Sequence, residues 1–84
     1  MLEQNSPNPF NAGTQIKYYL PENSDVKLTV SDITGNVIEI LAEGYQSSGW
    51  HTLNFSTGSL ASGTYYYKLE AGTYRTVKMM QIIK

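Results

Sequence analysis

The 84-residue sequence contains no cysteine and only one histidine. Without cysteine, neither a disulfide nor a thiolate metal site can brace the fold, so the hydrophobic residues, 40% of the chain, must stabilise it alone. A chain of this length forms one small domain, which buries only about 60–65% of its unfolded surface. The lack of disulfides leaves the compartment open, because a secreted domain with a sufficient core needs none.

Positive charge is scarce and scattered. Six lysine and arginine residues stand against seven aspartate and glutamate residues, which gives a formal net charge of −1. Nowhere do the six cations form a row that could neutralise consecutive phosphates: Lys17, Lys27, Lys68, Arg75, Lys78 and Lys84. Because phosphate contacts supply much of the affinity for nucleic acids, we expect no nucleic-acid partner.

Long hydrophobic runs are also absent. The longest apolar stretch, VIEILA, contains Glu39 and is far shorter than the roughly 20 residues that a membrane-spanning helix requires. We therefore expect no membrane insertion. The residues after Met1 lack the basic region and the apolar core of a signal peptide, so we expect either a cytoplasmic protein or a leader on a longer parent chain.

Groupings of side chains that could perform catalysis or hold a metal do not occur. The sequence contains no G-x-S-x-G motif with a nucleophilic serine for which His51 could act as the base, so we expect His51 to be structural or exposed. The carboxylates do not cluster, and Asp32 lacks the alternating ligands of a calcium loop, which favours an Asx-type turn there. We predict no enzymatic activity, no cofactor and no metal site.

The hydrophobic pattern has a period of two in four segments, residues 15–20, 26–32, 51–55 and 64–70. Their lysines fall on one face only, which identifies the opposite face as buried. The predicted inward residues are Ile16, Tyr18, Leu20, Val26, Leu28, Val30, Leu53, Phe55, Tyr65, Tyr67 and Leu69. Turn signals at intervals of about 8–12 residues make this an all-β sandwich or barrel.

Six glycines in the turns are predicted to adopt positive φ angles: Gly35, Gly44, Gly49, Gly58, Gly63 and Gly72. The segment VIEILAE does not alternate cleanly, which predicts a bulge or a twisted edge strand.

The two ends of the chain depart from simple alternation. Pro7 and Pro9 make residues 1–14 a stiff lead-in, with Phe10 as an anchor across one end of the sandwich formed by residues 15–84. The final stretch, TVKMMQIIK, is apolar on both faces. Such a strand is either central in a sheet or available for a partner to cover.

Aromatic residues offer one alternative function. Five are candidates for the surface, where they could stack against sugar rings: Tyr19, Tyr45, Trp50, Tyr66 and Tyr74. Outward tyrosines also form ordinary cross-strand pairs, worth about 0.2–1 kcal/mol each. The residues alone therefore leave binding, targeting and spacing open.

The sequence also matches longer motifs. It resembles the type A C-terminal sorting domains of the type IX (Por) secretion system of Gram-negative bacteria, which open with L-x-Q-N-x-P-N-P-F-N-x-x-T-x-I-x-Y-x-L-P. All thirteen named positions are filled between Leu2 and Pro21, including Pro7, Asn8, Pro9, Phe10 and Asn11. Later family blocks are matched by Asp32, Gly35, Gly63, Tyr65, Tyr67, Lys78, Met79 and Lys84.

The resemblance implies an immunoglobulin-like β-sandwich, for which we expect about seven short, mostly antiparallel strands. It implies a non-catalytic domain that directs an upstream cargo across the outer membrane and is then removed by a surface sortase. The implied partners are the type IX translocon, the sortase and the cargo. The cargo would enter the periplasm by its own signal peptide and finish at the outer-membrane surface or outside the cell. The alternative is a carbohydrate-binding or spacer module appended to a secreted enzyme.

We expect the C-terminal strand to carry the recognition surface for the sorting machinery. We expect this stretch to pair as an edge strand and to offer its outer face to a translocon receptor, while Lys78 and Lys84 discourage aggregation and supply charge contacts. The residues in question are Lys78, Met79, Met80, Ile82, Ile83 and Lys84.

Overall fold

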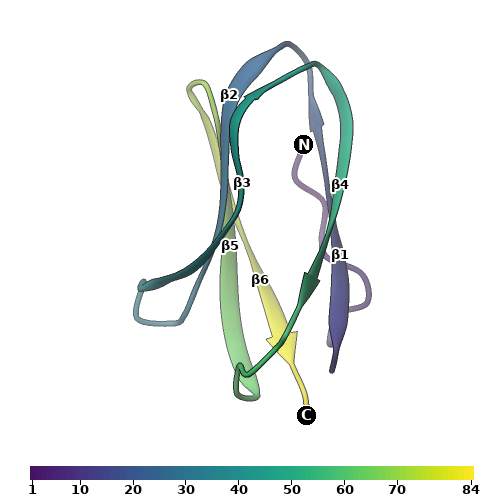
Figure 1. Cartoon of the computed structure of the whole chain (residues 1–84), viewed down its shortest axis with the longest axis vertical. Coiled ribbons are helices and arrows are strands. Elements are labelled where there is room, and N and C mark those ends of the chain that lie inside the picture. The colour runs from purple at the N-terminus through teal and green to yellow at the C-terminus, as the bar shows by residue number, and fades with distance from the viewer.

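The computed structural model describes all 84 residues and contains six strands and no helix. The strands are β1 (Gly13–Leu20), β2 (Ser24–Ser31), β3 (Val37–Gln46), β4 (Gly49–Ser56), β5 (Gly63–Ala71) and β6 (Tyr74–Ile82). They form a two-stranded sheet, β1-β4, and a four-stranded sheet, β3-β2-β5-β6, with antiparallel pairing throughout (Figure 1). The predicted all-β sandwich is confirmed, with six strands where about seven were expected.

Alternating side chains build the core between the sheets. The inward residues of β1, β2 and β5 are buried as predicted, and they belong to a single cluster of 15 buried hydrophobic residues. In β4, Phe55 is buried, whereas Leu53 is half-buried and packs against the cluster. The period of two therefore identified the buried face because apolar and charged residues occupy opposite sides of these strands.

The outermost strand of the four-stranded sheet, β3, is irregular. In the register with β2, Leu41 and Ile38 have no partner residue, so each is an extra residue of β3 opposite an uninterrupted β2. The irregularity predicted for VIEILAE is confirmed. Bulges twist an edge strand and discourage pairing with another chain.

A tight turn joins β2 to β3. The Asp32 carboxylate accepts hydrogen bonds from the Thr34 amide at 2.9 Å, the Thr34 hydroxyl at 2.6 Å and the Asn36 amide at 3.0 Å. The Thr34 hydroxyl contributes most to holding the pKa of Asp32 below its usual value. Gly35 has φ of 92°, a value that favours glycine. The predicted Asx turn is confirmed, and all six glycines predicted to have positive φ do so.

Residues 1–12, which we call the strap, lie along the side of the sandwich. Leu2 and Ser6 form antiparallel bridges to Tyr18 and Gln15 of β1, whereas Phe10 forms a parallel bridge to Ile82 of β6. The strap thus joins one edge of each sheet. Its prolines have no N–H group to donate, so the strap cannot form the continuous ladder of hydrogen bonds that a seventh strand would need. It forms isolated bridges instead.

Candidate functional site

The outer edge of β6 meets the strap, and this junction is the candidate site. Phe10 donates its amide to the Gln81 carbonyl oxygen at 3.1 Å and accepts a hydrogen bond from the Ile83 amide at 2.8 Å. These bonds use backbone groups of β6 that point away from β5. The end of β6 is therefore already paired on its outer side.

Two side-chain amides extend this pairing where the strap backbone does not reach. Gln4 Nε2 donates to the Met79 carbonyl oxygen at 2.8 Å, and the Gln81 amide donates to Asn8 Oδ1 at 3.0 Å. Side-chain amides can replace backbone ladder bonds in this way. The strap consequently satisfies the outer edge from Met79 of β6 to Ile83, the residue that follows β6.

A buried polar network fixes the strap in place. The Tyr67 hydroxyl donates to the Glu3 carbonyl oxygen at 2.7 Å and accepts a hydrogen bond from the Asn5 amide at 2.8 Å. Asn5 Nδ2 donates to Thr14 Oγ1 at 3.0 Å and to the Pro7 carbonyl oxygen at 3.1 Å. No buried side-chain nitrogen or oxygen lacks a partner. Burial raises the pKa of Tyr67 to about 12, so the hydroxyl stays protonated and able to donate.

Apolar anchors hold the strap from within the core. Leu2 and Phe10 are each 4% exposed, and the Phe10 ring meets the Phe55 ring edge to face at 6.4 Å. Phe10 therefore belongs to the hydrophobic core. The strap then runs into β1 beside Thr57, whose amide donates to the Ala12 carbonyl oxygen at 2.9 Å and whose hydroxyl donates to the Asn11 carbonyl oxygen at 3.2 Å.

The residues of the expected recognition strand divide between the two faces of the sheet. Met80 and Ile82 are 0% and 1% exposed and belong to the core, whereas Met79 and Ile83 are 49% and 58% exposed. Lys78 is half-buried and Lys84 is exposed. We call Met79, Ile83 and Lys84 the tail surface, because these three residues are the most accessible of the set.

Polar contacts position the two ends of the tail surface. The Lys84 amide donates to Ser62 Oγ at 2.9 Å and its Nζ donates to the Gly58 carbonyl oxygen at 3.0 Å, which holds it on the β4–β5 loop. Ile83 lies beside the strap and shares a shallow depression of about 420 Å³ with Pro7, Pro9, Phe10 and Asn11. The structure thus brings motif residues from the two ends of the chain together.

Other motif residues shape the scaffold. Tyr65 donates its hydroxyl to the Ala61 carbonyl oxygen at 2.8 Å, and Gly63 has φ of 153° at the start of β5. The distant partners of Gln4 and Asn8 and the Asn5–Thr14–Tyr67 network could not be identified from the sequence. The sequence did contain one indication of these contacts. Residues 1–12 hold more amide side chains than hydrogen bonds to the neighbouring backbone would require.

His51 and two of the exposed aromatic residues have ring partners within β1 and β4. His51 stacks on Tyr18 at 5.2 Å and donates from Nε2 to the Ser47 carbonyl oxygen at 2.7 Å. Trp50 and Tyr19 are paired at 5.2 Å but tilted by 59°, and Lys17 Nζ lies 4.7 Å from the indole centroid. The Trp50 and Tyr19 rings are therefore not coplanar.

Two further features complete the description of the molecule. The structure contains no group of three or more histidine, aspartate and glutamate side chains that could hold a metal ion. The structure also has no helix with the length and apolar character needed to cross a membrane.

Comparison with known protein families gives a match over most of the chain. The model of a family described as "secretion system C-terminal sorting domain" matches residues 6–84, which covers most of the strap and all six strands. No curated protein matches the sequence.

Proposed function

The chain belongs to the secretion system C-terminal sorting domain family and is a type IX secretion sorting signal, and we propose that it carries an upstream cargo across the outer membrane by contacts made at the tail surface. The observation that supports this site is the junction of strap and β6. Motif residues from both ends of the chain meet there, and Met79, Ile83 and Lys84 remain accessible.

We propose different roles for the residues of the C-terminal strand, supported by the difference in their burial. Met79, Ile83 and Lys84 contact the translocon directly, with Lys78 at the margin. Met80 and Ile82 face the core, so they hold the strand in position and do not reach a partner. The domain itself performs no chemistry in this scheme.

The surface sortase removes the domain by cleaving upstream of the strap. Leu2 is buried and the Glu3 amide donates to the Lys17 carbonyl oxygen at 2.9 Å, so the peptide bonds that follow Leu2 are held against β1. A protease needs an extended, accessible segment, which these residues do not provide. The cargo enters the periplasm by its own signal peptide and is released or coupled to an anionic lipopolysaccharide at the cell surface.

A secretion assay tests the proposal. The chain is fused behind a fluorescent reporter with a signal peptide, in a host with an intact type IX system, and the reporter is quantified in periplasm, cell surface and medium. We expect export that is lost in a translocon mutant and reduced by Ile83→Lys. The variant Tyr45→Lys, changed at an exposed residue of β3 outside the tail surface, is the control. A reporter that reaches the surface equally well without the domain would identify a passive spacer.

A further inference from the structure

The strand β4 lies at the edge of its sheet, and its outer side is free. It pairs only with β1. The strap bonds backbone groups of Gln15, Lys17 and Tyr19 in β1, so the β1 residues between them bond β4. Their partners are the odd-numbered residues of β4. The N–H and C=O groups of the even-numbered residues therefore point away from β1 and have no partner in the domain, including those of Thr52, Asn54 and Ser56.

The other sheet edges are blunted, whereas the edge of β4 is not. The strap covers the edges of β1 and β6, and two bulges distort β3. In contrast, β4 pairs with β1 in an unbroken register over 8 residues and contains no proline, lysine or carboxylate. Edge strands normally carry such features because an unpaired edge attracts other strands. The edge of β4 is therefore suited to strand addition, in which an extended peptide lengthens a sheet.

The four-stranded sheet extends past β4 and leaves β3 uncovered. The strap joins β1 to β6, so the two-stranded sheet lies over the β6 side and β3 lies beyond β4 (Figure 1). No residue of β3 is buried. Hydrophobic residues on this side pack against the core but are only half-buried: Leu41, Ala42, Leu53 and Leu60. A strand added to β4 would lie over β3 and remove these side chains from water.

A depression of about 330 Å³ lies between β3 and the end of β4. Ile38 and Glu39 of β3 line one wall, and residues 56–60 line the other. The wall of residues 56–60 begins with the last residue of β4. Side chains of a strand paired with β4 would enter between the sheets at this depression.

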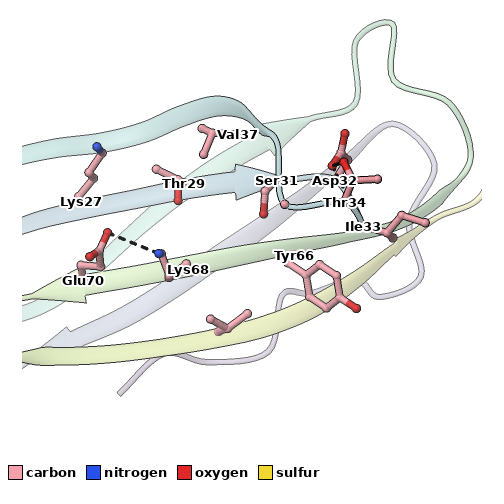
Figure 2. A pocket seen from close by; sticks show the side chains of 12 residues that line it. Lys27, Thr29, Ser31, Asp32, Ile33, Thr34, Val37, Tyr66, Lys68 and Glu70 are labelled. Atoms are coloured by element: carbon pink, nitrogen blue, oxygen red, sulfur yellow. Dashed lines mark hydrogen bonds and ion pairs between the residues drawn. The ribbon is translucent and has the colours of Figure 1, made fainter.

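Glu39 gives the depression a negative charge without an ion pair. It lies opposite the buried Val30 in the register, on the side of the sheet that faces β4. Both ion pairs of the domain are formed by Glu70 on the outer face of the sheet, and Figure 2 shows one of them. Lys84 borders the depression, but its Nζ donates to the Gly58 carbonyl oxygen. A lysine or arginine of an added strand would therefore complement Glu39.

The free edge ends next to the tail surface. Gly58, two residues after β4, accepts the hydrogen bond from Lys84 Nζ at 3.0 Å, so a partner on Lys84 lies beside the end of β4. An upstream cargo leaves the domain at the strap, which runs along β1 and β6 on the opposite side. The free edge is thus closer to a protein bound at the tail surface than to the cargo.

We propose that the free edge of β4 binds an extended strand of the secretion-machinery protein that contacts the tail surface. The backbone of this strand pairs with Thr52, Asn54 and Ser56. Its alternate side chains are apolar and cover Leu53 and the inner side of β3, and a lysine or arginine meets Glu39. This inference rests on the proposed function and adds a second contact to it.

Proline substitution tests the proposal in the reporter fusion described above. In Thr52→Pro the ring removes an N–H group that the domain itself does not use, so the pairing of β4 with β1 is retained. We expect export about tenfold lower, because a carbonyl oxygen of the partner strand loses its donor. Thr52→Ala keeps the N–H group and should be exported like the wild type. Thermal unfolding of the purified domain verifies that each variant folds.

Site-specific crosslinking identifies the partner. A photo-crosslinking phenylalanine analogue is placed at position 54 or at position 45, because both residues are exposed and Tyr45 lies opposite Asp25 on the outer face of the other sheet. We expect crosslinks from position 54 to a translocon protein identified by mass spectrometry, lost in Thr52→Pro, and none from position 45. Crosslinks from position 54 to a second copy of the fusion would overturn the proposal.

Failures of the two proposals are distinguishable. A wild-type fusion retained in the periplasm would overturn the proposed function. Normal export of the wild type without crosslinks from position 54 would overturn the strand-pairing proposal alone, whatever the proline variant does. A folded Thr52→Pro variant that is exported as well as Thr52→Ala would do the same.

Discussion

The side-chain amide of Gln4 donates a 2.8 Å hydrogen bond to the carbonyl oxygen of Met79, 75 residues later in the chain. This bond joins a motif at the start of the domain to the strand expected to face the sorting machinery. It gives a physical reason for the amide-rich opening sequence: the strap closes an edge of β6 that would otherwise expose unpaired backbone groups. Unpaired edges promote association with other strands.

Loss of a strap amide should expose the β6 edge locally. In Asn8→Ala the Gln81 amide loses its acceptor, and we expect a free-energy loss of about 0.5–1.5 kcal/mol. Native-state hydrogen exchange followed by NMR should show faster exchange of the Gln81 amide. Asn54→Ala is the control, because the exposed Asn54 side chain forms no hydrogen bond. Unchanged protection at Gln81 would show that Asn8 does not close the edge.

Removing the aromatic anchor should release the strap more completely. Phe10→Ala leaves a cavity beside Phe55, and truncations of this type cost about 3–5 kcal/mol, a large part of the stability of a small domain. Urea unfolding and limited proteolysis measure the loss and the accessibility of residues 1–12. Phe10→Leu, which keeps most of the apolar volume, provides a folded variant if the alanine variant unfolds. Equal protease resistance in Phe10→Leu and wild type, with no loss of stability, would contradict anchoring by the ring.

Much of the fold could be predicted from local sequence. Apolar residues on one face of the alternating segments, with lysines on the opposite face of three of the four, identified the inward residues. The Asp32 turn followed from the chemistry of a short acidic side chain near glycine. These features depend on neighbours within a few residues. The irregular register of β3 was also predictable, because its hydrophobic pattern breaks the period of two.

The site could be predicted only in outline. In TVKMMQIIK both faces are apolar, so alternation could not decide whether Met79 or Met80 enters the core; the position of the two-stranded sheet decides it. The contacts of Gln4 and Asn8 link residues more than 70 positions apart, and a local pattern contains no information about such pairing. The free edge of β4 likewise depends on the order of the strands in the two sheets.

The Asp32 turn should make stability depend on pH in the acid range. Hydrogen bonds from Thr34 and Asn36 hold the pKa of Asp32 below its usual value of 3.8. Its contribution is therefore complete above the unfolded pKa and is lost as the pH falls through the lower folded pKa. Asp32→Ala should lower the melting temperature at neutral pH and flatten this part of the profile. Asp25→Ala, at an exposed carboxylate without side-chain hydrogen bonds, should do neither.

The buried hydroxyl of Tyr67 should stabilise the strap through its two hydrogen bonds. Tyr67→Phe leaves the Asn5 amide and the Glu3 carbonyl oxygen without this partner, and we expect a loss of about 1–3 kcal/mol in chemical unfolding. Tyr66→Phe is a matched control on the outer face of the same strand, because the Tyr66 hydroxyl forms no hydrogen bond and should be removable at little cost. Equal effects of the two substitutions would exclude a structural role for the network.

The same hydroxyl should give the domain an alkaline limit. Burial, assisted by the charge of Glu3, raises the pKa of Tyr67 from 10.0 to about 12. Between these values the unfolded chain releases a proton that the folded chain retains, so the free energy of unfolding falls as the pH rises through this window. The free energy of unfolding is measured from pH 8 upward for the wild type and for Tyr67→Phe. Other tyrosines and lysines titrate in both proteins, so the difference between the two profiles reports the Tyr67 proton. We expect this difference to shrink only above about pH 10. A difference that stayed constant to pH 12 would mean that the folded domain does not hold the Tyr67 proton more tightly than the unfolded chain.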